Sequence, residues 1–285
     1  MSGKRVLTIQ DISCVGECSL SIAMPIIALF GCETAVLPTA VLSTHTGGFK
    51  DVKFRDLSDD MPAINAAWQA NGIRFDAIYS GYLGSAKQID SVLEIVRTSS
   101  SESSIYIADP AMADNGKLYS GFDSAFVQEM KRLCSKADVI LPNFTEACLL
   151  TDTPYTDTPD QALFIQLGEK LLALGAGCAV ITGASVSEDS TGFMTADENG
   201  CRFYSHRKIG KGCFGTGDAF AACFTGAVCR GLDRFEAAIL AAEFVAGCIE
   251  ETAKYPDHWY GSRFEPQLVE LAKRISELDG PGGVC

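Results

Sequence analysis

The chain has 285 residues, of which 47% are hydrophobic and 21% are charged, an ordinary globular balance. This length suits one large α/β domain, or two small ones, with a sizeable core. The formal net charge of −13 disfavours nucleic acid and anionic membranes as partners, so a phosphate site would need local, preorganised donors.

The N-terminal sequence lacks the apolar segment of a secretory signal, since the acidic Asp11 follows soon after two basic residues. No run reaches the ~18–20 apolar residues that a membrane helix needs. The twelve cysteines are scattered, and several lie inside apolar runs, which is typical of reduced thiols rather than of a disulfide framework. We therefore expect a cytoplasmic protein.

Short apolar runs alternate with amphipathic segments along most of the chain. The runs are β-branched or aromatic and predict strands at 5–9, 34–38, 77–80, 105–108, 139–141 and 179–182. Helical periodicity predicts helices at 18–30, 61–71, 86–97, 124–134 and 160–174. Three of these helices precede a glycine, the residue favoured at a left-handed cap, at Gly31, Gly72 and Gly175.

The βαβα order predicts an α/β fold with a mostly parallel sheet and helices on both faces. Near the C-terminus, strands at 192–195 and 202–205 flank a hairpin turn, and helices follow at 217–230, 234–252 and 266–277. We see no repeat or linker, so residues 1–285 are expected to form a single domain. The polar stretch 43–60 is expected to be a flap over a site, and residues 280–285 a frayed tail.

The sharpest chemical signal is GCFGTGDAF at residues 212–220, a glycine-rich loop that opens an apolar helix. Gly215 and Gly217 allow backbone N–H groups to approach an anion, and Thr216 adds a hydroxyl. Asp218 would repel a phosphate unless it had a task, and accepting a proton from an attacking hydroxyl is a task that fits. Taken alone, the motif is equally compatible with a plain helix-capping loop.

Polar residues also follow two predicted central strands. Asn143 and Glu146 come after the strand at 139–141 and have the spacing of a capping box. The same positions lie at the carboxyl end of a parallel strand, where ligands bind, and Glu146 could hold magnesium through water. Asp109 follows the strand at 105–108 in the same way. The residues alone leave the capping and the functional interpretations open.

The sequence GYLGS follows the strand at 77–80 and places an aromatic between two glycines. Such a loop would let Tyr82 lean over a flat ligand. The alternative is an ordinary strand-to-helix turn, with Ser85 as the N-cap of the next helix.

In this order, the motifs resemble those of the ribokinase-like superfamily and, within it, of the pyridoxal kinases. The segment TIQDISCVG at 8–16 is similar to the opening of these enzymes, LSTHTG at 42–47 resembles their flap, and SGYLGS at 80–85 is close to the bacterial form. The resemblance covers nearly the whole chain. It implies a three-layer α/β/α fold, usually a homodimer, that uses ATP and Mg²⁺ to phosphorylate the 5′-hydroxymethyl group of vitamin B6 vitamers.

The resemblance also implies a role for each motif residue. It makes Asp218 the catalytic base and makes the anion hole from Gly215, Thr216 and Gly217. It places Asp109, Asn143, Glu146, Thr182 and Gly183 around ATP, with Asp109, Asp114 and Glu146 near Mg²⁺ through water. It places Gln10, Asp11, His45, Thr46 and Tyr82 around the vitamer. Many pyridoxal kinases carry Ser where this chain has Asp11, which bears on the preferred vitamer, and GFKD at 48–51 replaces a tyrosine-containing continuation of the flap.

Three other functions compete with this one. A hydroxymethylpyrimidine kinase also acts on a flat heterocycle with a hydroxymethyl arm, but many such enzymes have Cys where this chain has Asp218. A sugar kinase would be expected to carry an N-terminal glycine pair, which is absent. A non-catalytic vitamer carrier would have no use for a base beside an anion hole.

Overall fold

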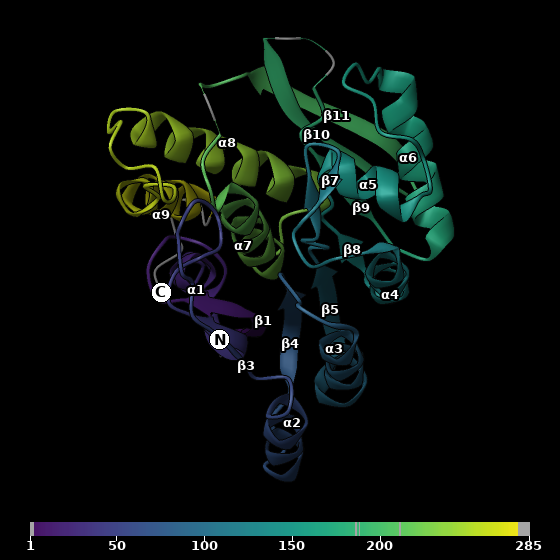
Figure 1. The fold of residues 1–285 in the computed structure, drawn as a ribbon, viewed down its shortest axis with the longest axis vertical. Helices are drawn as coiled ribbons and strands as arrows, with labels where there is room; N and C mark the ends of the chain where they lie inside the picture. The colour runs from purple at the N-terminus through teal and green to yellow at the C-terminus, as the bar shows by residue number, and fades with distance from the viewer. Residues whose placement is uncertain (1–2, 186, 188, 211, 279–285) are drawn as a thin grey trace.

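The computed structural model of the chain describes residues 3–185, 187, 189–210 and 212–278. Within these residues a nine-stranded sheet has the order β11-β10-β9-β8-β5-β4-β1-β2-β3 (Figure 1). Its strands are β1 (Arg5–Ser13), β2 (Glu33–Leu42), β3 (Phe54–Asp56), β4 (Phe75–Ser80), β5 (Ser100–Ala108), β8 (Val139–Ile140), β9 (Ala179–Thr182), β10 (Ser190–Asp197) and β11 (Gly200–Arg207). Two further strands, β6 (Ala113–Asp114) and β7 (Lys117–Leu118), pair with each other outside this sheet.

The sheet is parallel from β2 to β9 and antiparallel at its margins. Strands β2, β1, β4, β5, β8 and β9 pair in parallel, whereas β3 at one edge and the β10–β11 hairpin at the other are antiparallel. The expected mostly parallel sheet and the C-terminal hairpin are therefore confirmed. The tail expected at 280–285 lies outside the described residues.

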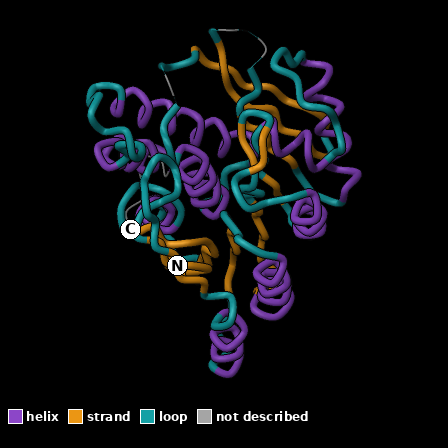
Figure 2. The backbone as a smooth tube through the Cα atoms, in the orientation of Figure 1, coloured by secondary structure: helices purple, strands orange, loops and turns teal. Residues whose placement is uncertain are grey.

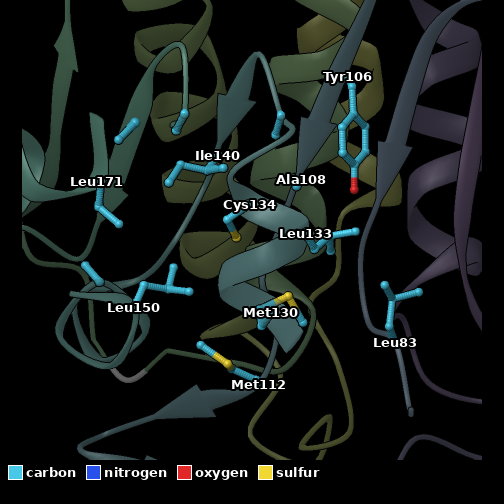
Figure 3. Close-up of a cluster of buried hydrophobic side chains, with 14 of the residues drawn as sticks. Leu83, Tyr106, Ala108, Met112, Met130, Leu133, Cys134, Ile140, Leu150 and Leu171 are labelled. Atoms are coloured by element: carbon cyan, nitrogen blue, oxygen red, sulfur yellow. The ribbon is translucent and has the colours of Figure 1, made fainter. Parts of the chain in front are cut away.

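Helices cover both faces of the sheet (Figure 2). The helices are α1 (Leu20–Leu29), α2 (Met61–Ala70), α3 (Ala86–Ser99), α4 (Ser124–Cys134), α5 (Phe144–Leu150), α6 (Gln161–Leu174), α7 (Thr216–Cys229), α8 (Arg234–Thr252) and α9 (Glu265–Leu278). One core packs α2 to α6 against the sheet, and Figure 3 shows part of it. The other core packs α1, α7, α8 and α9 on the opposite face. The central strand β1 sends Leu7 and Ile9 into the first core and Val6 into the second, as expected of a strand buried on both faces.

The structure differs from the sequence expectations mainly at one edge of the sheet. Strand β2 continues to Leu42 although it contains Pro38, because β3 pairs only with residues 40–42 and leaves β2 with a single neighbour at the proline. Strand β3 lies inside the stretch expected to be a flap, so residues 54–56 are part of the sheet. The glycines expected as left-handed caps all have positive φ. Among the described residues, no helix combines the length and apolarity needed to cross a bilayer.

Candidate active site

The polar residues singled out in the sequence gather along the carboxyl edge of the parallel strands. Asp11 lies near the end of β1, Asp109 directly follows β5, and Thr182 ends β9. Asn143 and Thr182 form an isolated parallel bridge, which brings the loops after β8 and β9 together. Gly183, the next residue, is exposed and has a φ of +69°. Because parallel strands end at the same edge, residues spread over most of the chain meet there.

Helix α7 begins at this edge with a tight turn. Gly215 is its N-cap with a φ of 81°, and a Cβ atom there would lie 1.9 Å from the carbonyl oxygen of Glu17. Only glycine therefore fits at this position. Thr216 donates its hydroxyl to the Cys213 carbonyl oxygen at 3.2 Å, and Gly217 is exposed with open space beside it. The first-turn N–H groups of a long helix thus face a region that an anion can reach.

Asp109 lies near two other carboxyl groups, those of Glu146 in the first turn of α5 and of Asp218 in the first turn of α7. Desolvation raises the pKa of Asp218 to about 7, helped by the negative charge of Asp11 and opposed by a backbone hydrogen bond from Ser19. Desolvation also raises the pKa of Glu146 to about 8. The pKa of Asp109 is raised by desolvation and then by the charges of Glu146 and Asp218. Each group therefore holds its proton more tightly than an ordinary carboxyl does.

Glu146 forms the capping box that its sequence spacing predicted. Asn143 accepts a hydrogen bond from the Glu146 N–H at 3.0 Å, and Glu146 accepts one from the Asn143 N–H at 2.9 Å. Glu146 also accepts a hydrogen bond from the Met112 N–H at 3.0 Å, and Asn143 donates to the Ala113 carbonyl oxygen at 2.8 Å. The pair therefore joins the start of α5 to the segment after β5, whatever else it binds.

Asp109 differs from Glu146 because its charge is uncompensated. It is 8% exposed, and within the described part of the chain its carboxylate has no hydrogen bond or ion pair. Asp114 is exposed and accepts hydrogen bonds from its neighbour Asn115. No three His, Cys, Asp or Glu side chains in the described residues converge to hold a metal directly. A buried, unpaired carboxylate nevertheless fits a hard cation that keeps most of its waters, as Mg²⁺ does.

An aromatic cluster, formed by His45, Phe49, Phe214, Trp259 and Tyr260, closes the other side of the edge. His45 is buried, with ring centroids 5.0 Å from Phe49 and 4.9 Å from Phe214. Its Nδ1 accepts a hydrogen bond from the Gly47 N–H at 3.0 Å, so the Nε2–H donates to the Tyr260 carbonyl oxygen at 2.6 Å. Thr46 lies exposed in the same segment.

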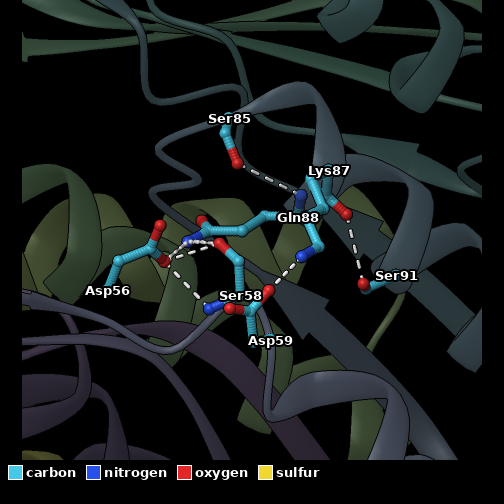
Figure 4. Close-up of polar contacts among 7 residues, drawn as sticks. All are labelled: Asp56, Ser58, Asp59, Ser85, Lys87, Gln88 and Ser91. Carbon is cyan, nitrogen blue, oxygen red and sulfur yellow. Dashed lines mark hydrogen bonds and ion pairs between the residues drawn. The ribbon is translucent and has the colours of Figure 1, made fainter.

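The loop that carries Tyr82 is fixed by hydrogen bonds to a buried glutamine, Gln88. Gln88 accepts a hydrogen bond from the Gly84 N–H at 2.7 Å and donates to the Thr39 carbonyl oxygen at 3.1 Å. It also donates to Asp56 at 3.1 Å and to Ser58 at 3.0 Å (Figure 4). Ser85 is the N-cap of α3, as one interpretation of the sequence predicted. Tyr82 itself is half-buried, with its ring centroid 5.7 Å from that of Phe122.

Two buried polar residues lie in the last half of β1. Gln10 donates to the Thr8 hydroxyl at 2.8 Å, while its side-chain oxygen has no partner in the described structure. Asp11 accepts hydrogen bonds from the hydroxyls of Ser19 at 2.6 Å and Ser13 at 3.2 Å, and desolvation raises its pKa. A buried carboxylate needs hydrogen-bond donors, and for Asp11 these donors are the hydroxyls of Ser13 and Ser19.

Sequence reasoning missed several residues that shape this edge. Ser19 and Glu17 pack against the start of α7, and His258 lies 3.5 Å from the Glu17 carboxylate. Trp259 and Tyr260 belong to the aromatic cluster. The only local signal was the run HWY at 258–260, since nothing in the sequence indicates that this loop meets residues 45–49.

Comparisons with known proteins agree with this fold. The family model for phosphomethylpyrimidine kinase matches residues 25–262. A Bacteroides thetaiotaomicron protein assigned to that family and crystallised with pyridoxal is 34% identical, with a TM-score of 0.89 over 94% of this chain and 96% of that one. Pyridoxal kinase from Lactobacillus plantarum is 33% identical, with a TM-score of 0.87 over 99% of both chains. A curated Schizosaccharomyces pombe relative is 30% identical over 52% of this chain and 48% of its own, so the match spans about half its length.

Proposed function

Because the chain belongs to the phosphomethylpyrimidine kinase family, we propose that it is a pyridoxal kinase, which transfers a phosphoryl group from ATP to the 5′-hydroxymethyl group of a B6 vitamer. The observation that carries the proposal is Asp218, whose carboxyl group has a pKa of about 7 and lies in the first turn of a helix that begins with a glycine turn. A base whose pKa lies near the working pH is the one that general base catalysis needs.

Asp218 would accept the proton of the vitamer hydroxyl as its oxygen attacks the γ-phosphorus. The bond from that phosphorus to the β,γ-bridging oxygen breaks, and ADP leaves with the electron pair. Gly215, Thr216 and Gly217 would stabilise the charge on the transferred group through their backbone N–H groups, aided by the dipole of α7.

The nucleotide would lie toward β5, β8 and β9. Asp109, Asn143 and Glu146 would face the phosphates, with Thr182 and Gly183 beside the nucleotide. Mg²⁺ would neutralise phosphate charge here, and Asp109, Asp114 and Glu146 would hold it through water. The unpaired carboxylate of Asp109 supports this arrangement, since phosphates approaching buried carboxylates without a cation would be repelled.

The vitamer would lie on the opposite side of Asp218, between the loop of Tyr82 and the aromatic cluster. Gln10, whose side-chain oxygen lacks a partner, would offer an acceptor to the ring substituents. Thr46 is exposed and free to contact a ligand, while His45 would act through the loop that it holds. Asp11 lies with this group, and its role is argued below.

We also propose a cytoplasmic homodimer. Its net charge of −13 gives little reason to bind nucleic acid or anionic membranes. A shallow, largely apolar surface between α1 and α9 supports a protein contact on that face, and it is lined by Leu29, Leu268, Val269, Ala272, Lys273 and Ser276. Sedimentation of the purified chain would measure its mass in solution, and a monomer at all concentrations would contradict the dimer.

The experiment that tests the function is a coupled assay of ADP release with Mg²⁺ and ATP. Pyridoxal, pyridoxamine, pyridoxine and hydroxymethylpyrimidine are compared as acceptors. We expect at least one B6 vitamer to give the highest kcat/KM. If hydroxymethylpyrimidine is preferred by a wide margin, the chain is instead a kinase of thiamine synthesis, which the family model also describes. Absence of any vitamer-dependent ADP release from folded protein would reject the proposal.

A further inference from the structure

The carboxylate of Asp11 accepts hydrogen bonds from the protein itself, although it lies beside the proposed vitamer pocket. It is 5% exposed, and its Oδ1 accepts the hydroxyl hydrogen of Ser19 at 2.6 Å, whereas Ser13 is more distant at 3.2 Å. The shorter contact makes Ser19 its main partner. This arrangement leaves little of the carboxylate for a ligand.

Ser19 has a backbone conformation that serine rarely adopts. It directly precedes α1 with φ 53° and ψ −130°, a region that favours glycine. Its side chain forms no hydrogen bond to the helix, because it is turned toward Asp11 instead. The hydrogen bond to Asp11 therefore anchors the side chain of Ser19 in this strained conformation, while an isolated antiparallel bridge pairs the Ser19 backbone with Ile12.

The segment 17–19 contacts both parts of the proposed catalytic loop. The carbonyl oxygen of Glu17 fills the space where a side chain at residue 215 would lie. The Ser19 N–H lies near the carboxyl group of Asp218 and lowers the pKa of that group. If the segment 17–19 lost its anchor, the Ser19 N–H would be free to move away from Asp218.

We propose that Asp11 is a positioning residue, which holds the segment 17–19 against the loop that carries the base, Asp218. The proposal rests on the proposed function, in that it takes Asp218 as the base. It differs from the expectation for Asp11 in the sequence, because the carboxylate acts through Ser19 and need not touch the vitamer.

The local charges allow a sharp test. The titratable groups near Asp218 are Asp11 on β1, Cys18 before α1, Tyr79 on β4, Asp109 after β5 and Tyr119 after β7, and His45 faces Asp11. Only Asp11 is changed in the variants below. Asp11→Asn removes the charge but keeps an oxygen that can accept from Ser19, whereas Asp11→Ala removes both.

The first measurement is the pKa of Asp218, from a carboxyl ¹³C NMR titration assigned with Asp218→Asn. Asp11→Asn should lower it, because a neighbouring negative charge is lost. Both variants lack the charge of Asp11, so the loss of charge affects the pKa of Asp218 equally in the two. A difference in the Asp218 pKa between Asp11→Asn and Asp11→Ala therefore reports on the position of the Ser19 N–H. We expect the pKa in Asp11→Ala to exceed that in Asp11→Asn, since the carboxylate has lost a donor.

The second measurement is activity. Asp11→Ala should lower kcat roughly ten- to a hundredfold with little change in the vitamer KM, as expected when a base is misplaced. Asp11→Asn should keep kcat within a few fold, with the acidic limb of its pH profile moved to lower pH. Adding Ser19→Gly to Asp11→Ala should restore most of the loss, because glycine adopts this conformation without an anchor. Ser13→Ala is the matched control and should change little.

Three results would overturn the proposal. One is equal damage by Asp11→Asn and Asp11→Ala with a raised vitamer KM, which would mean direct contact with substrate. Another is failure of Ser19→Gly to restore activity, and the third is equal Asp218 pKa values in the two Asp11 variants. Should Asp11→Ala not fold, Ser19→Ala replaces it and should raise the pKa of Asp218 above that of the native protein. The titration needs no substrate, so it still decides the matter if the native protein phosphorylates no vitamer.

Discussion

At the proposed nucleotide end of the site two carboxyl groups lie near a third, that of Asp109, whereas at the proposed vitamer end five rings pack together. The carboxyl groups of Asp109, Glu146 and Asp218 all have raised pKa values, because they are desolvated near like charges. The aromatic cluster holds its one imidazole, His45, with hydrogen bonds on both nitrogens. One end is therefore sensitive to charge, pH and cations, and the other to the shape of its side chains.

This difference indicates how the two ends divide the work. Carboxylates that lie close together without a cation repel one another and destabilise the folded state. A ligand that brings a cation removes this repulsion and stabilises the fold. A cluster of rings is already stable and gains nothing from a cation. Variants at the two ends should therefore fail in different ways, and each prediction below either strengthens or removes that contrast.

The largest effect is expected at Asp218. Asp218→Asn should lower kcat by about 10²–10⁴-fold while ATP still binds, because a neutral amide cannot accept the proton but leaves the glycine turn intact. Steady-state kinetics and nucleotide titration measure the two effects. A near-native kcat would reject Asp218 as the base, and loss of ATP binding would make its role structural.

Glu146 should show a mixed effect, because it caps α5 and also faces the proposed cation. Glu146→Gln places an amide nitrogen near backbone N–H donors and should destabilise the fold by about 1–3 kcal/mol. It should also raise the Mg²⁺ concentration at half-maximal rate more than it raises the vitamer KM. Glu198→Gln is the matched control, since it removes an exposed carboxylate in the turn between β10 and β11, where it caps no helix and lies outside the proposed cation site. If only thermal stability falls in Glu146→Gln, Glu146 is a structural cap alone.

Stability should fall as pH rises through neutrality when no Mg²⁺ is present. The pKa of Asp218, about 7, and that of Glu146, about 8, exceed the ordinary values of 3.8 and 4.5, so the folded state keeps protons that the unfolded state releases. The stability that this proton binding provides is fully present at a pH below the ordinary pKa values. It is lost as the pH rises through the raised pKa values of the folded state. Between about pH 5 and 8.5 we expect the melting temperature to drop by roughly a few degrees, and Mg²⁺ with ATP to reverse the drop. A melting temperature that rises over this interval would show that the carboxyl groups are not desolvated as described.

Much of the nucleotide end was predictable because its signals are local. The strand at 179–182 and the helices at 124–134 and 234–252 have their predicted bounds, since each shows its period and its flanking breakers. The sequence spacing of Asn143 and Glu146 gave the capping box directly. The carboxyl ends of parallel strands lie at the same edge of the sheet. The topology alone therefore predicts that the carboxylates that follow these strands lie close together.

The vitamer end was less predictable because it depends on contacts between distant loops. His45 bonds to Tyr260 across 215 residues, and no periodicity indicates that pairing. The positive φ of Ser19 was equally unpredictable from the sequence, because a positive φ is expected at glycine and not at serine. The edge strand at 54–56 was missed since its pattern is short and all three of its residues are exposed.

The smallest effect, and the one that isolates the aromatic end, is expected from Phe49→Leu. Phe49 packs on His45 at 5.0 Å and on Trp259 at 4.8 Å, so leucine keeps the apolar character but loses two aromatic pairs. Such pairs contribute about 0.5–1.5 kcal/mol each, so the vitamer KM should rise roughly two- to tenfold. The KM for ATP and the Mg²⁺ dependence should stay at native values.

Trp68→Leu is the matched control for that variant. Trp68 packs on Phe75 at 5.2 Å, but Phe75 begins β4 and so lies at the edge of the sheet opposite the site. Trp68→Leu should lower the melting temperature without changing either KM. If Phe49→Leu raised the KM values for ATP and vitamer together, the aromatic cluster would serve the whole site. The contrast between a charge-sensitive end and a shape-sensitive end would then be lost, because a single change of shape would have disturbed both.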